Sequence, residues 1–246
     1  MTGTWTTIAI DGKAADVYEP VGVTRPRFGI MHLHGLGLET LVDRPAFTRW
    51  FDEWKLPCVC PHGQRSWWAD RICSEFDTQI TPERFLLDNV LRFFRERWSL
   101  TPQAIGLQGI SMGGQGALRL AFKYPDLFPV VAALSPAIDY YELYGQGTPL
   151  DDMYDSKEQC RQDTVLLHVH PSRFPPHIFF CIDPDDLRWY RGNDRLQEKL
   201  AALGIPHELD LSTRAGGHSW EYFNHMAERV ERFIYSGLQQ ESRRLL

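Results

Sequence analysis

Ser111 stands in the run Gly109-Ile110-Ser111-Met112-Gly113, a G-x-S-x-G pattern. The pattern is common by chance, so its setting decides its meaning. It follows an apolar run at 104–110 that is typical of a strand, and it opens a segment with helical periodicity. A serine in such a strand–turn–helix is held in a strained turn, where side chains two positions away on either side would collide with it. The turn therefore predicts a serine nucleophile; an ordinary serine at a glycine-rich helix start is the alternative.

A serine hydroxyl needs a general base, and the base needs an acid to orient it. His218 lies between the last predicted strand, 207–211, and the last predicted helix. It should therefore lie at the same edge of the sheet as Ser111. His225 falls inside the following helix and is interpreted as structural. His218 is accordingly the predicted base.

The acid should lie between Ser111 and His218 in chain order. The apolar run at 177–182 is followed by three carboxylates, Asp183, Asp185 and Asp186. Asp186 is the first choice and Asp185 the runner-up, whereas Asp183 could cap the helix that follows.

Acyl transfer places negative charge on the carbonyl oxygen, which requires fixed N–H donors. The backbone N–H of Met112, directly after the nucleophile, is one expected donor. The second should come from the run His34-Gly35-Leu36-Gly37. The Leu36 amide is favoured, with Gly37 next, and His34 is interpreted as a packed residue that supports this loop.

The elements that must position these residues alternate between strand-like runs and helical stripes, which is typical of a mainly parallel sheet. Helical periodicity covers 87–98 after Pro82, 117–122, 196–203 and 223–234. The predicted strands lie at residues 5–10, 27–33, 56–60, 104–110, 129–134, 177–182 and 207–211.

Consecutive units with short connections predict a single domain over residues 1–246. The exception is 139–176, which could form a cap over the carboxyl edge of the sheet. Trp67, Trp68 and Trp220 are expected near that edge and are candidates for the walls of an acyl or aryl pocket. Ordinary burial of large aromatic residues is an equal alternative. Weaker candidates lie in the cap at Tyr140, Tyr141 and Tyr144.

Composition narrows the class of protein. The chain has 246 residues and a net charge of −6, which argues against a nucleic-acid partner. It has no apolar run of the ~18 residues that a membrane span needs, and no visible signal peptide at its start.

The five cysteines lack paired CxxC spacing, so neither disulfides nor zinc are expected. His168 and His170 form an H-x-H pair without an evident third ligand. We expect a cytoplasmic protein without cofactor or metal, and the oligomeric state stays open.

The motifs together resemble one family. His34-Gly35-Leu36, the run from Gly109 to Leu118 and Gly217-His218-Ser219-Trp220 are similar to the α/β-hydrolases grouped as "Putative esterase". That family includes esterase D (S-formylglutathione hydrolase) and feruloyl esterases. In α/β-hydrolases the acid usually lies about four residues past the last buried strand position, which favours Asp186. The chain departs from the family in having Asp183 where a glycine is usual, and in lacking the cysteine that esterase D carries after the Leu36 loop.

The resemblance implies an α/β-hydrolase fold with a mostly parallel, roughly eight-stranded sheet, helices on both faces and a small cap. It also implies hydrolysis of small acyl or aryl esters without a cofactor. Ser111, Asp186 and His218 would form the catalytic triad, and the amides of Leu36 and Met112 would form the oxyanion hole. The alternatives are an acyltransferase or small-peptide hydrolase with the same triad, or a non-catalytic binding protein that retains the fold.

Overall fold

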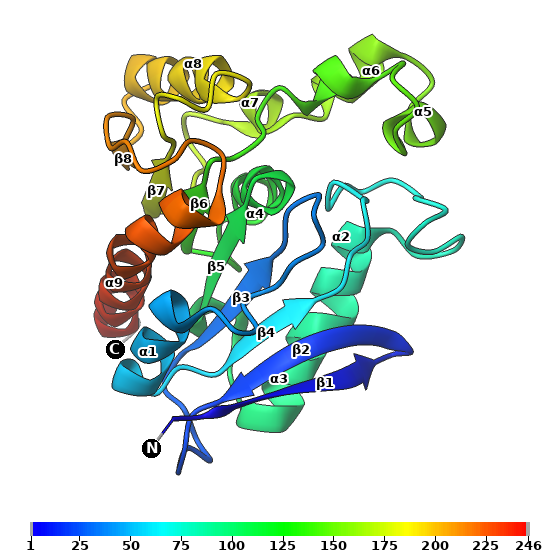
Figure 1. Ribbon diagram of the computed structural model, residues 1–246. Helices are drawn as coiled ribbons and strands as arrows, with labels where there is room; N and C mark the ends of the chain where they lie inside the picture. Colours follow the sequence, from blue (N-terminus) through cyan, green and yellow to red (C-terminus); the bar gives the residue numbers. More distant parts are fainter. Residues whose placement is uncertain (1, 245–246) are drawn as a thin grey trace.

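The computed structural model describes residues 2–244, and three residues of the expected domain (1, 245 and 246) lie outside this range. One eight-stranded sheet runs through the molecule in the order β1-β2-β4-β3-β5-β6-β7-β8. The first two strands form an antiparallel hairpin, β2 pairs antiparallel with β4, and the strands from β4 to β8 are parallel (Figure 1). The strands are β1 Thr4–Ile10, β2 Lys13–Glu19, β3 Gly29–Leu33, β4 Cys58–Pro61, β5 Ile105–Ile110, β6 Val130–Leu134, β7 His177–Cys181 and β8 Glu208–Asp210.

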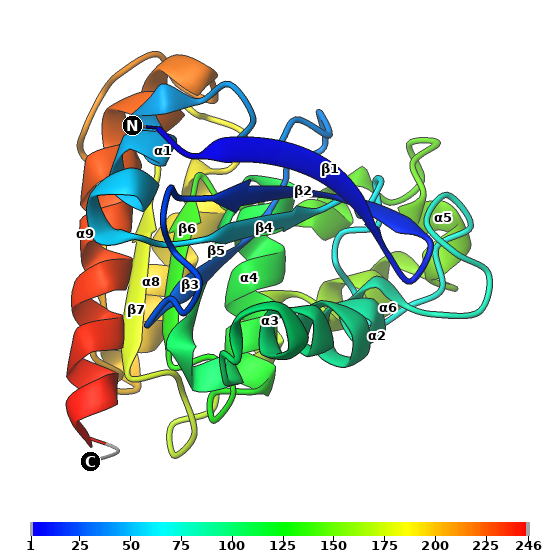
Figure 2. The same cartoon turned by 90° about the horizontal axis from the view of Figure 1, so that it is seen from below.

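Helices cover both faces of this sheet (Figure 2). On one face α1 packs against α9, and on the other lie α2, α3, α4 and α8. A π-helical turn at Leu86–Val90 joins α2 to α3. The helices are α1 Pro45–Trp54, α2 Pro82–Phe85, α3 Leu91–Trp98, α4 Met112–Lys123, α5 Leu150–Met153, α6 Lys157–Gln162, α7 Val165–His168, α8 Tyr190–Ala202 and α9 Trp220–Arg244.

The central strands are apolar on both faces because both are covered by helices. In β6, Val130, Ala132 and Leu134 belong to the core under α9, whereas Val131 and Ala133 belong to the core under α4. All five are fully buried. The predicted fold class, a mostly parallel sheet between two helical layers, is confirmed.

Outside residues 139–176, two elements were not predicted from the sequence. Strand β2 contains Asp16, a charged residue that interrupts an apolar run. The structure buries this carboxylate and supplies partners for it, among them the hydroxyl of Thr40 at 2.8 Å and His62 Nε2 at 2.9 Å. Helix α1 begins at Pro45 and buries only Phe47 and Phe51, so its apolar stripe is short.

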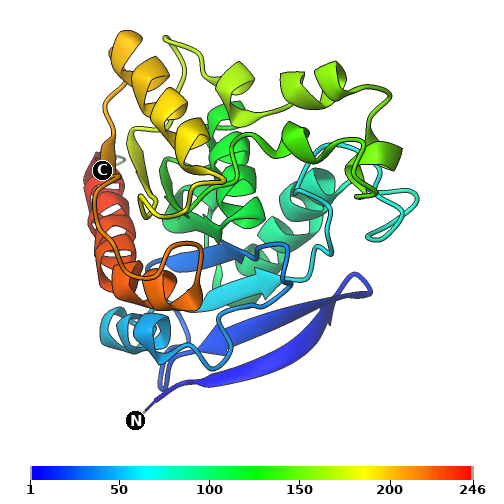
Figure 3. The ribbon, with the colours of Figure 1, turned by 45° about the horizontal axis from the view of Figure 1, so that its top comes forward.

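The segment 139–176 contains α5, α6 and α7 and a 3₁₀ turn at Tyr140–Leu143. It runs across the side of α4 and reaches the carboxyl edge of the sheet (Figure 3). We refer to it as the cap segment. Leu143, Thr148 and Pro149 from this segment help to line a cavity of about 650 Å³.

A buried ionic cluster attaches the cap segment to the body of the fold. Arg119 on α4 is 1% exposed and pairs with Glu83 at the start of α2 and with Asp163 of the cap segment. Glu83, which is fully buried, also accepts hydrogen bonds from Lys123 at 2.5 Å and from the Tyr124 hydroxyl at 2.8 Å. The charged side chains of α2, α4 and the cap segment therefore pair with one another.

Replacing Arg119 should destabilise the protein strongly. In Arg119→Ala two carboxylates lose their main cation, and breaking a buried pair from one side typically costs ~3–5 kcal/mol of unfolding free energy. Urea denaturation measures this loss. Arg161→Ala is the matched control, because Arg161 makes an exposed ion pair with Glu158 and its loss should leave the midpoint almost unchanged. Equal midpoints for the two variants would contradict the structural role of the cluster.

Candidate active site

Ser111 occupies the turn between β5 and α4 with φ +55° and ψ −115°, a conformation that L residues rarely adopt. The flanking glycines make room for it. A Cβ on Gly109 would lie 2.2 Å from the carbonyl oxygen of Gly113, and a Cβ on Gly113 would lie 1.9 Å from that of Leu33. Both contacts are backbone contacts that cannot relax. The turn therefore requires glycine at both positions, as its sequence pattern predicts.

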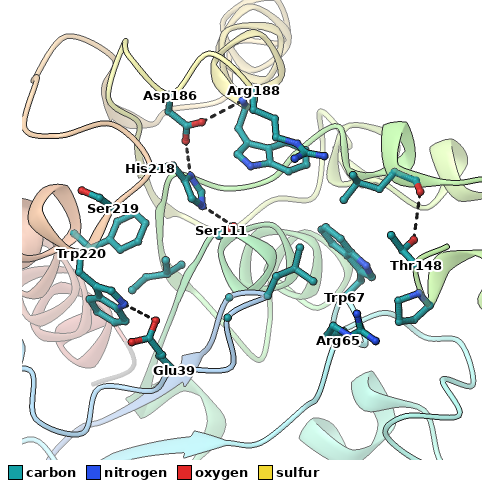
Figure 4. Close-up of a pocket in the computed structure, with 18 residues that line it drawn as sticks. Glu39, Arg65, Trp67, Ser111, Thr148, Asp186, Arg188, His218, Ser219 and Trp220 are labelled. Carbon is teal, nitrogen blue, oxygen red and sulfur yellow. Dashed lines mark hydrogen bonds and ion pairs between the residues drawn. The ribbon is translucent and has the colours of Figure 1, made fainter. Parts of the chain in front are cut away.

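His218 connects Ser111 to Asp186 (Figure 4). Its Nε2 lies 3.0 Å from Ser111 Oγ, and its Nδ1 lies 2.6 Å from Asp186 Oδ2. Asp186 is 4% exposed, and its other oxygen accepts a hydrogen bond from the backbone N–H of Trp189. Because a carboxylate accepts from Nδ1–H, the Nε2 lone pair is left facing the serine hydroxyl. The arrangement can remove the proton of Ser111.

The two neighbouring carboxylates have other partners. Asp185 is exposed and forms an ion pair with Arg214. Asp183 is fully buried and accepts three backbone N–H groups, those of Asp185 at 2.8 Å, Ala215 at 2.6 Å and Gly217 at 2.9 Å. Of the three, Asp186 is thus the carboxylate that reaches the imidazole.

The expectation that Asp183 caps the following helix is wrong, because α8 begins only at Tyr190, with Trp189 at its N-cap. Asp183 instead fastens the loop that carries Asp186 to the loop that carries His218. Burial raises the pKa of Asp183, but its N–H donors outweigh that effect and hold the pKa below its usual range.

The two expected oxyanion donors come from the start of α4 and from the loop after β3. Met112 is the first residue of α4, so its N–H has no acceptor within the helix. Leu36 follows β3 and lines the cavity beside Ser111. Gly35, which precedes Leu36, approaches Ser111 closely, since a Cβ on Gly35 would lie 3.3 Å from the Cβ of Ser111. Within residues 2–244, no backbone hydrogen bond of the loops uses the Leu36 N–H. The assignment of both amides stays a prediction.

His34 supports this loop, as expected. Its Nε2 accepts the backbone N–H of Gly63 at 2.9 Å, and its Nδ1 lies 2.8 Å from the Gly35 carbonyl oxygen. Burial lowers the pKa of His34 to about 4, so the ring is neutral at pH 7. Trp68 Nε1 donates to the His34 carbonyl at 3.1 Å. The loop is therefore held from two sides.

A cavity of about 650 Å³ opens above the serine. Trp67 lines it and stacks on Tyr140, with ring centroids 4.8 Å apart. Trp220 lines the opposite side of Ser111, where its Nε1 donates to Glu39 at 2.9 Å (Figure 4). Two of the three tryptophans expected at a pocket are thus in its wall.

The expectation that Trp68 lines the cavity is wrong. Its ring packs against His34, on the loop that carries Leu36, and Trp68 is not among the lining residues. The weaker candidates Tyr140, Tyr141 and Tyr144 are also not among the lining residues. Sequence reasoning missed the polar residues of the wall, which come from different loops and share no motif: Glu39, Arg65, Thr148 and Arg188.

The H-x-H pair does not form a metal centre in the described part of the chain. His168 Nε2 lies 3.2 Å from Asp163, and His170 Nδ1 accepts the backbone N–H of Ser172. Across residues 2–244, no group of three or more His, Cys, Asp and Glu side chains could hold a metal ion. Over the same residues, no helix is both long and apolar enough to cross a membrane.

The sheet order, the serine turn after β5, the acid after β7 and the histidine after β8 define an α/β-hydrolase. The model of the family described as "Putative esterase" matches residues 55–230. The chain belongs to this family, and it is a serine hydrolase of the carboxylic ester class. No curated protein matches its sequence.

Solved structures with the same fold include three hydrolases at low sequence identity. An S-formylglutathione hydrolase from Agrobacterium tumefaciens superposes with a TM-score of 0.76 at 15% identity, covering 96% of this chain and 94% of that one. A fluorophosphonate-binding serine hydrolase from Staphylococcus aureus gives 0.74 at 18%, covering 97% and 99%. A ferulic acid esterase gives 0.73 at 17%, covering 95% and 98%. At these identities the likeness establishes the fold.

Replacing Asp183 should remove a pH-dependent contribution to stability. Asp183→Asn turns an acceptor of three N–H groups into a side chain that must also place its own NH₂ donors there. Because the native pKa lies below the unfolded value, the carboxylate stabilises the protein above the unfolded pKa, and this stabilisation is lost as pH falls below about 4.

The wild type should therefore exceed Asp183→Asn in unfolding free energy at pH 7, and the difference should shrink in denaturation curves at decreasing pH. Asp185→Asn provides the control, since its carboxylate is exposed. A wild-type advantage that is constant from pH 7 to pH 3 would be incompatible with this role.

Proposed function

We propose that the protein is a serine carboxylesterase that hydrolyses small acyl or aryl esters through an acyl-enzyme intermediate. Ser111 is the nucleophile, His218 the general base and acid, and Asp186 the residue that orients the imidazole. The backbone amides of Met112 and Leu36 bind the oxyanion.

One observation carries this proposal: the continuous hydrogen-bond chain from Ser111 through His218 to Asp186, at 3.0 Å and 2.6 Å, below an open cavity. The cavity volume of about 650 Å³ suits a small organic molecule. Its wall includes the ring of Trp220, which is partly exposed, and that of Trp67, which is fully buried, and an aromatic wall favours aryl and short acyl groups.

The steps follow from this geometry. Ser111 Oγ attacks the carbonyl carbon while its proton passes to His218 Nε2, and the carbonyl oxygen becomes an anion bound by the two amides. As the intermediate collapses, the bond to the alcohol oxygen breaks and His218 returns the proton to that oxygen. A water then attacks the acyl-enzyme, gives its proton to His218, and releases the acid when Ser111 regains a proton.

A cytoplasmic location is part of the proposal. All five cysteines are free and buried, with Cys58 Sγ and Cys60 Sγ 3.8 Å apart as thiols. Free thiols persist in a reducing compartment.

Removing the nucleophile should abolish most of the activity. Ser111→Ala should lower kcat on 4-nitrophenyl butyrate by on the order of 10³-fold or more, because covalent catalysis is lost. Release of 4-nitrophenolate gives the rate, and circular dichroism checks the fold. Unchanged turnover would exclude this mechanism, and transfer of the acyl group to an added alcohol in preference to water would identify an acyltransferase.

The acid can be tested by a pair of variants. Asp186→Asn should lower kcat by on the order of 10³–10⁴-fold, since the amide favours the wrong imidazole tautomer. Asp185→Asn should change kcat little, because Asp185 pairs with Arg214 on the surface. The reverse ranking of the two variants in the same assay would assign the acid to Asp185.

A further inference from the structure

Most of the charges that line the cavity are already paired within the protein. Glu39 forms an ion pair with Arg44 at 2.7 Å and accepts the indole N–H of Trp220. Arg65 pairs with Glu75. Asp186 is paired with His218. These charges are compensated before any substrate binds.

Arg188 is the exception. It lines the cavity and is exposed, and among residues 2–244 no carboxylate lies within ion-pair distance of it. The guanidinium lies over the ring of Trp189, 5.2 Å from its centroid, which restrains the long side chain. The cavity thus carries one positive charge that no carboxylate of the described residues compensates.

Arg188 places this charge on one side of the cavity. It lies on the loop between β7 and α8, two residues after Asp186, and in the close-up it occupies the same side of Ser111 as Trp67 and Thr148 (Figure 4). Trp220 and Glu39 lie on the other side (Figure 4). The side of the cavity that contains Thr148 of the cap segment, which we call the cap side, therefore carries the free cation, whereas the Trp220 side carries a paired anion.

The chain as a whole carries a net charge of −6. A guanidinium presents two parallel N–H donors that match the two oxygens of a carboxylate. A neutral ester would leave this group to solvent.

We propose that the cap side of the cavity binds a carboxylate of the substrate and that Arg188 selects for it. The substrate class is then esters that carry a free carboxylate on the acyl or the alcohol part. The assignment rests on the proposed function, because it concerns the substrate of the Ser111 site.

Two matched pairs of esters test this assignment and separate the two sources of the carboxylate. Mono-4-nitrophenyl adipate is compared with its methyl ester, and 3-carboxyphenyl butyrate with its methyl ester. In at least one pair kcat/KM should be about tenfold higher for the free carboxylate, the effect of one charge-assisted hydrogen-bonded pair. The preference should decline with added salt, because Arg188 is exposed.

Arg188→Gln should bring that preference ratio close to one, and Arg188→Lys should restore part of it, because the charge returns without the paired donors. Arg191→Gln is the matched control: Arg191 is an exposed arginine three residues further on that does not line the cavity, so the ratio should stay as in the wild type.

The two proposals fail in different ways. Ser111-dependent hydrolysis of the neutral esters with a wild-type ratio at or below one in both pairs would overturn the assignment of Arg188 and leave the esterase proposal intact. Equal ratios for Arg188→Gln and Arg191→Gln would also overturn it. Failure to hydrolyse any of the four esters would contradict the proposed function itself.

Discussion

The geometry of the site depends on the close packing of two backbone segments, the first turn of α4 and the end of β3. Gly113 lies so near the carbonyl of Leu33 that a single Cβ would come within 1.9 Å of it. This contact places the serine turn and the loop that carries Leu36 against one another. The nucleophile and the expected oxyanion donors are therefore set by one steric constraint, before any side-chain hydrogen bond is made.

The second half of the site is held by Asp183 in an equivalent way. Its buried carboxylate binds N–H groups from its own loop and from the loop of His218, so that acid and base face each other at 2.6 Å. The cap segment is attached separately, through Arg119 and its two carboxylates. Independent anchors thus position the catalytic loops and the cavity wall, and substitutions in one anchor need not disturb the other.

The parts that the sequence predicts are those with local signals. Strands buried on both faces read as apolar runs, and the serine turn reads as two glycines around Ser111 because its constraint is steric and local. The roles of Asp183 and Trp68 could not be predicted from local sequence, because their hydrogen-bond partners lie far away along the chain, at Gly217 and His34. The charges of the cavity wall likewise depend on which loops the sheet brings together.

The central claim is that Ser111 forms the covalent intermediate, and mapping the site of a covalent adduct tests it most directly. The folded protein is treated with a fluorophosphonate, digested, and its peptides are sequenced by mass spectrometry. The account predicts one adduct, on the Ser111 hydroxyl, that forms in the native protein and does not form in protein denatured before the treatment, because His218 and Asp186 must activate the serine. A native protein that stays unmodified, or carries its adduct on another residue, would contradict it.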